Sequence, residues 1–459
     1  MKRKLLALSL VGISTSVFAG PSQFSGPLNT LGNVSTQQTI LSATVNPAAG
    51  EFVVEKSYRW GYMSTLGFGL EVGQVDDLEE GLDALTEELD RLEAKADNFL
   101  EIVTLAEVEA VQAQFTGFLV DLGEKGTLQF ALQARAPVFP IVIRSDLIKG
   151  VLTLDAHVTA DVGVRFIDSP LEIVVPDVLA GETDFRLTTD TVIDLSAAVV
   201  SAYSVGYSHD LANSPFFGDE TFSFMKGGDR LLVGAELNIY NVSMTSQMVA
   251  IDQEVSNEDL GDVISDEFDS NQVDSTDFGL DLGVLWVSNN FQLGATWKNI
   301  NEPTFESSVL GVSCFQLSSA TSRRNCEVAA ELGAAGRIDL RPEYVMESQV
   351  SFEGAITTEN KHWSFAGAFD ANPVEGPLKD EYQWATASAS YFSDSLWIPM
   401  ARLGFRTNLS GSELSYVSAG ITAFGGIHVD ASMSLDTITV DGEDQPRALS
   451  LNVGIERRF

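Results

Sequence analysis

Long apolar runs are what this sequence of 459 residues most clearly lacks. Hydrophobic residues make up 44% of the chain, yet it has no run of about 18 consecutive apolar residues, the length that a membrane-spanning α-helix requires. The sequence therefore excludes a membrane protein built from spanning helices.

Basic residues are also scarce, because 27 Lys and Arg stand against 65 Asp and Glu and leave a formal net charge of −38. A surface this acidic repels the phosphate backbone, so we expect no nucleic-acid contact along the protein surface. The four histidines are scattered, and the motifs of zinc proteases, phosphate-binding loops and serine-hydrolase elbows are missing. We expect no enzymatic activity, no metal and no cofactor.

Cysteine is nearly absent, since Cys314 and Cys326 are the two in the chain. In an oxidising compartment such a pair forms a disulfide that closes a short loop. A metal site would need further Cys or His residues nearby, and two free thiols are the remaining alternative. The disulfide is the favoured interpretation.

The N-terminus has the pattern of a secretory signal peptide. Lys2, Arg3 and Lys4 precede an apolar stretch that begins at Leu5, and small residues flank Phe18 in Val17-Phe18-Ala19. This pattern predicts cleavage after Ala19, so that residues 1–19 are removed and the protein is exported. The apolar stretch is too short to span a membrane comfortably, which disfavours an uncleaved anchor.

Alternation of apolar and polar residues dominates the rest of the chain. In Val151–Phe166, eight apolar residues from Leu152 to Phe166 lie on one face, and residues such as Asp155, His157 and Arg165 lie on the other. A soluble sheet would bury the apolar face, whereas a membrane barrel turns it towards lipid and encloses the polar face in a lumen. One strand alone does not distinguish the two.

The number and spacing of the strands favour the barrel. About fourteen segments alternate in this way, and the connections between them alternate between short and long, as periplasmic turns and external loops do. We therefore predict an all-β fold, a transmembrane barrel of about 14 antiparallel strands over residues 58–459. The predicted strands are Tyr58–Val72, Thr127–Ala136, Val151–Phe166, Val192–Tyr207, Leu231–Val242, Phe278–Val287, Phe291–Ile300, Tyr344–Ala355, His362–Ala371, Tyr382–Tyr391, Trp397–Arg406, Tyr416–Phe424, His428–Asp436 and Ala448–Phe459.

The polar faces of the first strands predict a wall of lumen-facing side chains. Charges in a lumen line a pore, or pair with one another and with a plug that closes it. We regard a satisfied network of ion pairs as the simpler alternative to a dedicated substrate site. The predicted wall residues are Arg59, Gln133, Arg135, Asp155, His157, Asp161 and Arg165.

The last strand carries a separate signal. Leu449, Leu451, Val453 and Ile455 alternate with polar residues, and the chain ends at Phe459. A terminal aromatic residue on an amphipathic strand resembles the signal that outer-membrane assembly machinery reads. We therefore expect an outer-membrane location, with membrane lipid and the barrel-assembly machinery as partners.

Residues 73–125 interrupt the strand pattern. Apolar residues recur at steps of three and four over Val75–Phe99, and a second helical stretch covers Leu105–Leu122. These segments predict a helical insertion after the first strand, outside the cell. It is either a hairpin of two helices packed on each other or a coiled coil that binds an external protein partner.

Short motifs give a family resemblance. Asn46-Pro47-Ala48 resembles the NPA segment of FadL-type outer-membrane channels, and segments such as Trp297–Pro303 and Trp363–Pro373 look like motifs of the TraF-like family within that superfamily. The resemblance covers most of the chain. It implies that residues 20–57 plug the barrel and that an acidic helical insertion follows the first strand.

Two functions remain open at this stage. The TraF-like resemblance implies a non-enzymatic component linked to conjugative transfer or envelope assembly. The alternative is a FadL-like channel for the uptake of hydrophobic compounds. An apolar pocket near the plug would favour the channel, whereas a wholly polar lumen suits a structural barrel.

Overall fold

The computed structural model describes residues 24–54, 59–76, 78–96, 102–176, 184–211, 229–250, 271–317, 319–393, 399–440 and 442–459. The predicted signal peptide, residues 1–19, lies outside these ranges. Within them, no helix is both long enough and apolar enough to cross a membrane.

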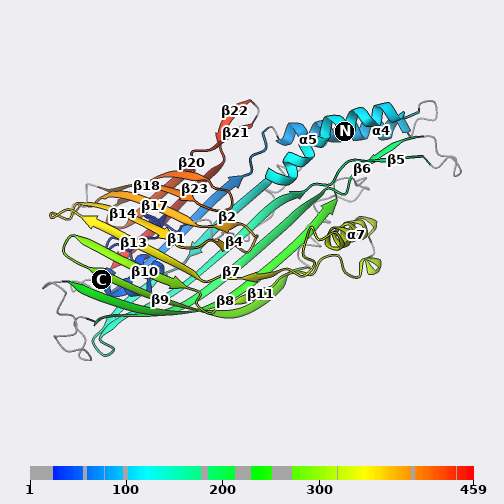
Figure 1. The fold of residues 1–459 in the computed structure, drawn as a ribbon. Helices are drawn as coiled ribbons and strands as arrows, with labels where there is room; N and C mark the ends of the chain where they lie inside the picture. Colours follow the sequence, from blue (N-terminus) through cyan, green and yellow to red (C-terminus); the bar gives the residue numbers. More distant parts are fainter. Residues whose placement is uncertain are drawn as a thin grey trace.

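A closed antiparallel sheet forms the body of the molecule (Figure 1). It closes where β1 (Trp60–Val72) pairs with β23 (Ala448–Arg458), from Gly61 opposite Arg458 to Glu71 opposite Ala448. The predicted barrel of 14 strands is confirmed, with one extra strand. The other strands, in order, are β2 (Thr127–Arg135), β3 (Ile141–Ser145), β4 (Gly150–Ile167), β7 (Val192–Asp210), β8 (Arg230–Ala250), β9 (Val273–Val287), β10 (Phe291–Lys298), β13 (Gln349–Thr357), β14 (Trp363–Asp370), β17 (Trp384–Tyr391), β18 (Met400–Asn408), β19 (Ser415–Ala423) and β20 (Ile427–Ser434).

The extra strand arises because one position in the wall is shared by two short strands. β2 pairs with β1 up to Arg135 and with β4 up to Ala134, and β3 then takes over the pairing with the same two neighbours. The segment between them contains Pro137 and Pro140, which have no N–H to donate to a sheet. The sequence predicted a long connection over 137–150, and β3 lies within it.

The outer face of the sheet is apolar and its inner face is polar, which is the reverse of the arrangement in a soluble protein. On β9, Phe278, Leu280 and Leu282 are exposed on the outside, while Asp281 between them is only 5% exposed. An outward apolar band with a polar interior is the arrangement of barrels that stand in lipid. The alternation in the sequence predicted this pattern.

The strands differ strongly in length around the barrel. β4, β7, β8 and β9 have 18, 19, 21 and 15 residues, whereas β10, β14 and β20 have 8 each. The long strands therefore extend past the others on one side (Figure 1). That side also carries α4 (Leu78–Ala96) and α5 (Leu105–Lys125), and we call it the helical end and the opposite side the turn end.

Helices α4 and α5 occupy the predicted insertion and begin and end within a few residues of the predicted bounds. Their apolar faces pack together with Phe166 and Leu171 in one cluster, which includes Leu85, Leu92 and Phe115. Glu107 joins the helices, because it accepts hydrogen bonds from Lys95 at 2.5 Å and from the Thr104 hydroxyl at 2.8 Å. The insertion is therefore a packed hairpin that also contacts β4.

Smaller elements cover the helical end. The predicted strand Tyr344–Ala355 divides there, because β13 begins at Gln349 and residues 343–345 form a separate strand that pairs with 304–306. Helix α7 (Ala320–Ala334) follows η4 (Cys314–Gln316), and the predicted disulfide between Cys314 and Cys326 links the two. The remaining hairpins are β5 (Glu172–Val174) with β6 (Arg186–Thr188), β11 (Thr304–Glu306) with β12 (Glu343–Val345), β15 (Val374–Glu375) with β16 (Glu381–Tyr382), and β21 (Thr437–Val440) with β22 (Glu443–Pro446).

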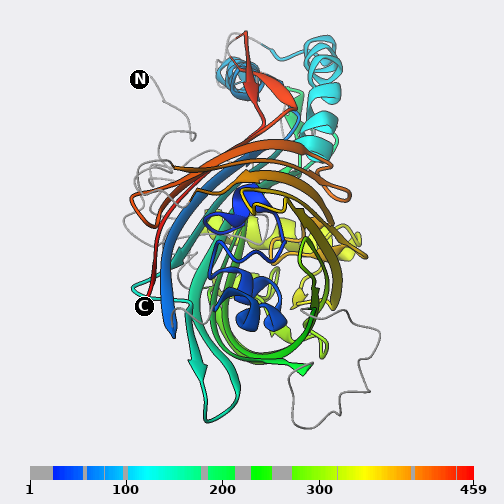
Figure 2. The same cartoon turned by 90° about the vertical axis from the view of Figure 1, so that its left-hand side faces the viewer.

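Residues 24–54 lie inside the barrel, and we call them the plug (Figure 2). They form four short helical turns and pair with no barrel strand as a sheet within the described residues. The plug begins at Phe24, which packs on Trp384 near the helical end, and ends at Val54, which packs on Val142 and Val151 near the turn end. Its turns are α1 (Leu28–Leu31), α2 (Ser42–Val45), η2 (Pro47–Ala49) and α3 (Gly50–Val53).

Candidate functional site

The candidate site is the contact between the plug and the lumen wall. Asn46 is its central residue, since its Oδ1 accepts from the Ala48 N–H at 3.0 Å and so caps η2. The Nδ2 group of Asn46 donates to the Val284 carbonyl at 3.2 Å and to Glu353 Oε1 at 2.9 Å. One side chain therefore shapes the plug and fixes it to β9 and β13.

Pro47 and Ala48, the other residues of the predicted plug motif, lie against glycines of the wall. A Cβ atom on Gly234 of β8 would overlap the carbonyl group of Pro47, and one on Gly283 of β9 would overlap Asn46 Oδ1. Gly234 and Gly283 face each other in register. The plug approaches the wall this closely because these positions carry no side chain.

Glu353 on β13 joins two distant parts of the plug. Besides Asn46, it accepts hydrogen bonds from the Ser35 hydroxyl at 2.7 Å and from the Ser35 backbone N–H. Its side chain is only 7% exposed, and three donors from the plug surround it. The prediction of lumen-facing residues did not include Glu353, although its alternation with outward-facing Phe352 could have identified it.

Further carboxylates hold the plug on other sides of the barrel. Asp430 on β20 accepts from the Thr30 hydroxyl at 2.6 Å and forms a buried ion pair with Arg402 at 2.8 Å. Glu456 on β23 accepts from the Ile40 backbone N–H at 3.0 Å. The plug is therefore bonded to strands around the whole barrel.

An ion-pair cluster fixes the last turn of the plug near the turn end. Glu51 of α3 contacts Arg144 at 2.7 Å and Arg230 at 3.1 Å. Arg230 also contacts Asp210 at 3.0 Å. A plug carboxylate is thus held between two strands of the wall, β3 and β8.

Four of the predicted wall residues form one connected group with the plug. Arg135 contacts Asp155 at 3.2 Å, and His157 Nδ1 lies 2.8 Å from the same Asp155 Oδ2. Arg135 and Gln133 both hydrogen-bond the Ser25 hydroxyl of the plug. This group is a connected network of hydrogen bonds and ion pairs between wall and plug, in which Asp155 Oδ1 has no hydrogen-bond partner among the described residues.

The other three predicted wall residues lie apart. Arg165 pairs with Asp194 at 2.8 Å and is 44% exposed. Asp161 is 7% exposed and faces the lumen. Arg59 lies at the rim near the turn end, 79% exposed and 3.4 Å from Asp146.

Two small cavities lie along the lumen wall in the described part of the chain. One of about 20 Å³ is lined by wall residues such as Glu71 and Arg406, and one of about 10 Å³ is lined in part by the plug residues Asn33 and Val45. A water molecule needs about 10–15 Å³, whereas an empty cavity that binds benzene measures about 150 Å³. In the described part of the chain, no group of three or more His, Cys, Asp or Glu side chains is arranged to hold a metal ion.

These features define a class of protein, the closed antiparallel β-barrel with an internal plug. The chain belongs to the family described as "F plasmid transfer operon, TraF, protein", whose profile matches residues 43–370. The family resemblance predicted from the sequence is thereby confirmed.

Solved structures similar to this chain include two toluene transporters. TodX of P. putida shares 10% identity at a TM-score of 0.49, with 95% of this chain and 98% of that chain covered. TbuX of Ralstonia pickettii shares 11% identity at a TM-score of 0.46, with the same shares covered. Among curated proteins, none matches the sequence significantly.

Proposed function

We propose that this protein is a channel of the bacterial outer membrane that the plug closes and that opens when the plug is displaced. The observation that carries the proposal is how the plug is held. Its polar contacts with the wall are side-chain hydrogen bonds and ion pairs, such as Asn46 with Glu353 and Glu51 with Arg144. Water can replace bonds of this kind without disrupting the sheet.

The outward apolar band supports the membrane location in this proposal. Side chains such as Phe68, Ile239 and Leu403 are 45%, 49% and 66% exposed on the outer surface. In water a continuous surface of this kind would be a large aggregation-prone patch, whereas in lipid it is the favourable state. Phe459, at the end of β23, is the proposed signal for the barrel-assembly machinery.

Small apolar compounds are the proposed cargo. At the helical end, the plug residues Phe24, Leu28 and Leu41 pack with Trp384 and Leu414 in an apolar cluster. This cluster is the apolar surface that a compound would meet on entering from that end. Displacement of the plug would turn this packed cluster into an open apolar pocket above the polar wall.

A reversible lock of the plug tests the proposal. A Cβ atom on Gly50 would lie 2.6 Å from Ser208 Oγ, so Gly50→Cys with Ser208→Cys places two thiols within bonding reach. We expect no channel openings from the oxidised double variant in planar bilayers, and openings after reduction. Deletion of residues 20–57 should give permanently open channels.

The wild-type protein under the same reduction is the control, because its own disulfide joins Cys314 and Cys326 at the helical end. Equal conductance and equal uptake of a small apolar compound by the locked, reduced and plug-deleted forms would refute the proposal.

A second candidate function rests on the helical end. The strands β4, β7 and β8 extend past the other strands at this end, and α4 and α5, which are rich in Asp and Glu, lie there. We infer a binding surface for an external protein partner in conjugative transfer or envelope assembly. Deletion of residues 73–125, with the turn rebuilt, should lower mating frequency in a plasmid host if this is correct, and normal frequency would contradict it.

A further inference from the structure

Arg406 on β18 differs from the other buried arginines of the lumen. Arg135 and Arg402, which are 6% and 4% exposed, each have a carboxylate partner at 3.2 and 2.8 Å. Arg406 is 4% exposed and has no carboxylate within 4.0 Å among the described residues. Its Nε and Nη1 atoms have no hydrogen-bond partner in the same part of the chain, and Nη2 donates to Ser432 at 3.3 Å.

Aromatic rings surround this guanidinium. Its central carbon lies 4.6 Å from the ring centroid of Tyr416, 5.2 Å from that of Trp384 and 5.0 Å from that of Phe24. Cation–π contacts compensate in part for the loss of water around a buried cation. Tyr416 and Trp384 belong to the wall, but Phe24 belongs to the plug. Arg406 therefore loses its cation–π contact with Phe24 when the plug moves.

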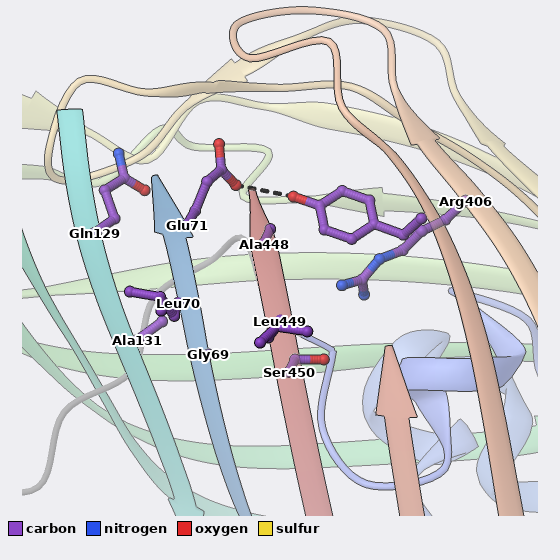
Figure 3. Close-up of a pocket in the computed structure, with 10 residues that line it drawn as sticks. Gly69, Leu70, Glu71, Gln129, Ala131, Arg406, Ala448, Leu449 and Ser450 are labelled. Carbon is purple, nitrogen blue, oxygen red and sulfur yellow. Dashed lines mark hydrogen bonds between the residues drawn. The ribbon is translucent and has the colours of Figure 1, made fainter. Parts of the chain in front are cut away.

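Glu71 of β1 faces the same place from the other side. Arg406, Tyr416 and Glu71 all line the cavity of about 20 Å³ (Figure 3). The Tyr416 hydroxyl donates to Glu71 Oε2 at 2.9 Å, while the face of the same ring carries the guanidinium. Tyr416 therefore contacts both the cation and the carboxylate, which line one small cavity without pairing with each other.

We propose that Glu71 is the partner of Arg406 in the open state and that their ion pair stabilises an open channel. Loss of the Phe24 ring removes one of the three cation–π contacts of the guanidinium, and the cavity that Arg406 and Glu71 both line gives it room to turn towards Glu71. A contact that forms in only one of two states shifts the equilibrium towards that state. The inference rests on the proposed function and adds its regulation.

Single-channel recording of three changes tests it. Phe24→Ala should raise the open probability, because it removes the plug's contact with Arg406. In the Phe24→Ala background, Glu71→Gln should lower the open probability at least about fivefold, a typical size for coupling between sites. Arg406→Gln should do the same, and the two together should have no further effect. Glu375→Gln, at an exposed acid of the same end, is the control.

An ion pair that forms only in the open channel can be distinguished from one that stabilises the barrel in both states. In the Phe24→Ala background, the effects of Glu71→Gln and Arg406→Gln on open probability should be non-additive. In the plugged protein with Phe24 intact, the effects of the same two substitutions on the thermal unfolding temperature should be additive. Additive effects of Glu71→Gln and Arg406→Gln on opening, in variants that keep heat-modifiable gel mobility, would overturn the inference alone. A plug-deleted barrel that does not conduct would overturn the proposed function and this inference together.

Discussion

Phe459 stacks on Trp60, with ring centroids 4.4 Å apart and planes inclined by 18°. The two rings join the last residue of the chain to the first barrel strand, and the Phe459 N–H donates to the Trp60 carbonyl at 2.8 Å. The contact lies at the seam where β1 and β23 close the barrel. It gives the terminal aromatic residue a structural role in addition to its proposed role as an assembly signal.

Phe459→Ala should weaken this seam. A stacked aromatic pair contributes about 0.5–1.5 kcal/mol beyond its buried area. On gels of samples heated in detergent, we expect the folded barrel of the variant to unfold, and so to change its mobility, at a lower temperature than the wild type. Phe424→Ala is the matched control, since Phe424 is 71% exposed at the same end and has no ring contact among the described residues. Equal transition temperatures of the two variants would contradict the prediction.

Acid should loosen the α4–α5 hairpin through Glu107. The hydrogen bond from Lys95, followed by those from the backbone and hydroxyl of Thr104, lowers the pKa of Glu107 from 4.5 to about 2. Since the pKa is depressed in the folded state, the stabilisation is complete above about pH 4.5 and disappears as the pH falls through 2. Helical circular dichroism at 222 nm should fall over that range, and Glu107→Gln should show a smaller change.

Gly234→Ala should dislodge the plug, because the new Cβ overlaps the carbonyl group of Pro47. We expect more frequent channel openings and faster proteolysis within residues 24–54. Gly354→Ala is the control on the outer face, where a Cβ would lie 3.2 Å from the flexible side chain of Leu293. The same plug accessibility in both variants would show that the wall tolerates the added methyl group.

Glu353→Gln should weaken the plug without disturbing the sheet. In the variant, an NH₂ group replaces one carboxylate oxygen and faces the N–H and O–H groups of Ser35 and Asn46, which are themselves hydrogen-bond donors. The negative charge that strengthens these hydrogen bonds is also lost. A hydrogen bond to a charged group is worth about 1.5–3 kcal/mol. Hydrogen exchange at the Ser35 amide should therefore be at least about tenfold faster. Glu359→Gln, an exposed acid on the turn after β13, should leave that rate unchanged.

The barrel could be predicted because apolar side chains alternate with polar ones along most of each strand, which is the pattern of a barrel with an apolar outer face. For Val151–Phe166 the predicted strand and β4, Gly150–Ile167, nearly coincide. The predicted end of a strand was wrong where this alternation stops. β8 continues to Ala250, beyond the predicted end at Val242. Met244 and Met248 are buried under elements of the helical end, so apolar and polar residues no longer alternate there.

Helix α7 was missed for a related reason. It buries a narrow stripe that includes Val328 and Leu332 with Ser322 and Asn325, which is too mixed to give a clear apolar period. The contacts of the plug were beyond prediction because they join residues far apart in sequence, 307 positions from Asn46 to Glu353. The Asn46-Pro47-Ala48 segment indicated which residues plug the barrel, but not where they bind.

The position of the plug at the start of the chain constrains the order of biogenesis. Thr30 bonds to Asp430, a residue 400 positions later, so the part translated first reaches its final contacts only after the last hairpins exist. The plug can therefore take its final position only while the β1–β23 seam closes or afterwards through an end of the barrel, so the folding of the N-terminal segment depends on completion of the wall.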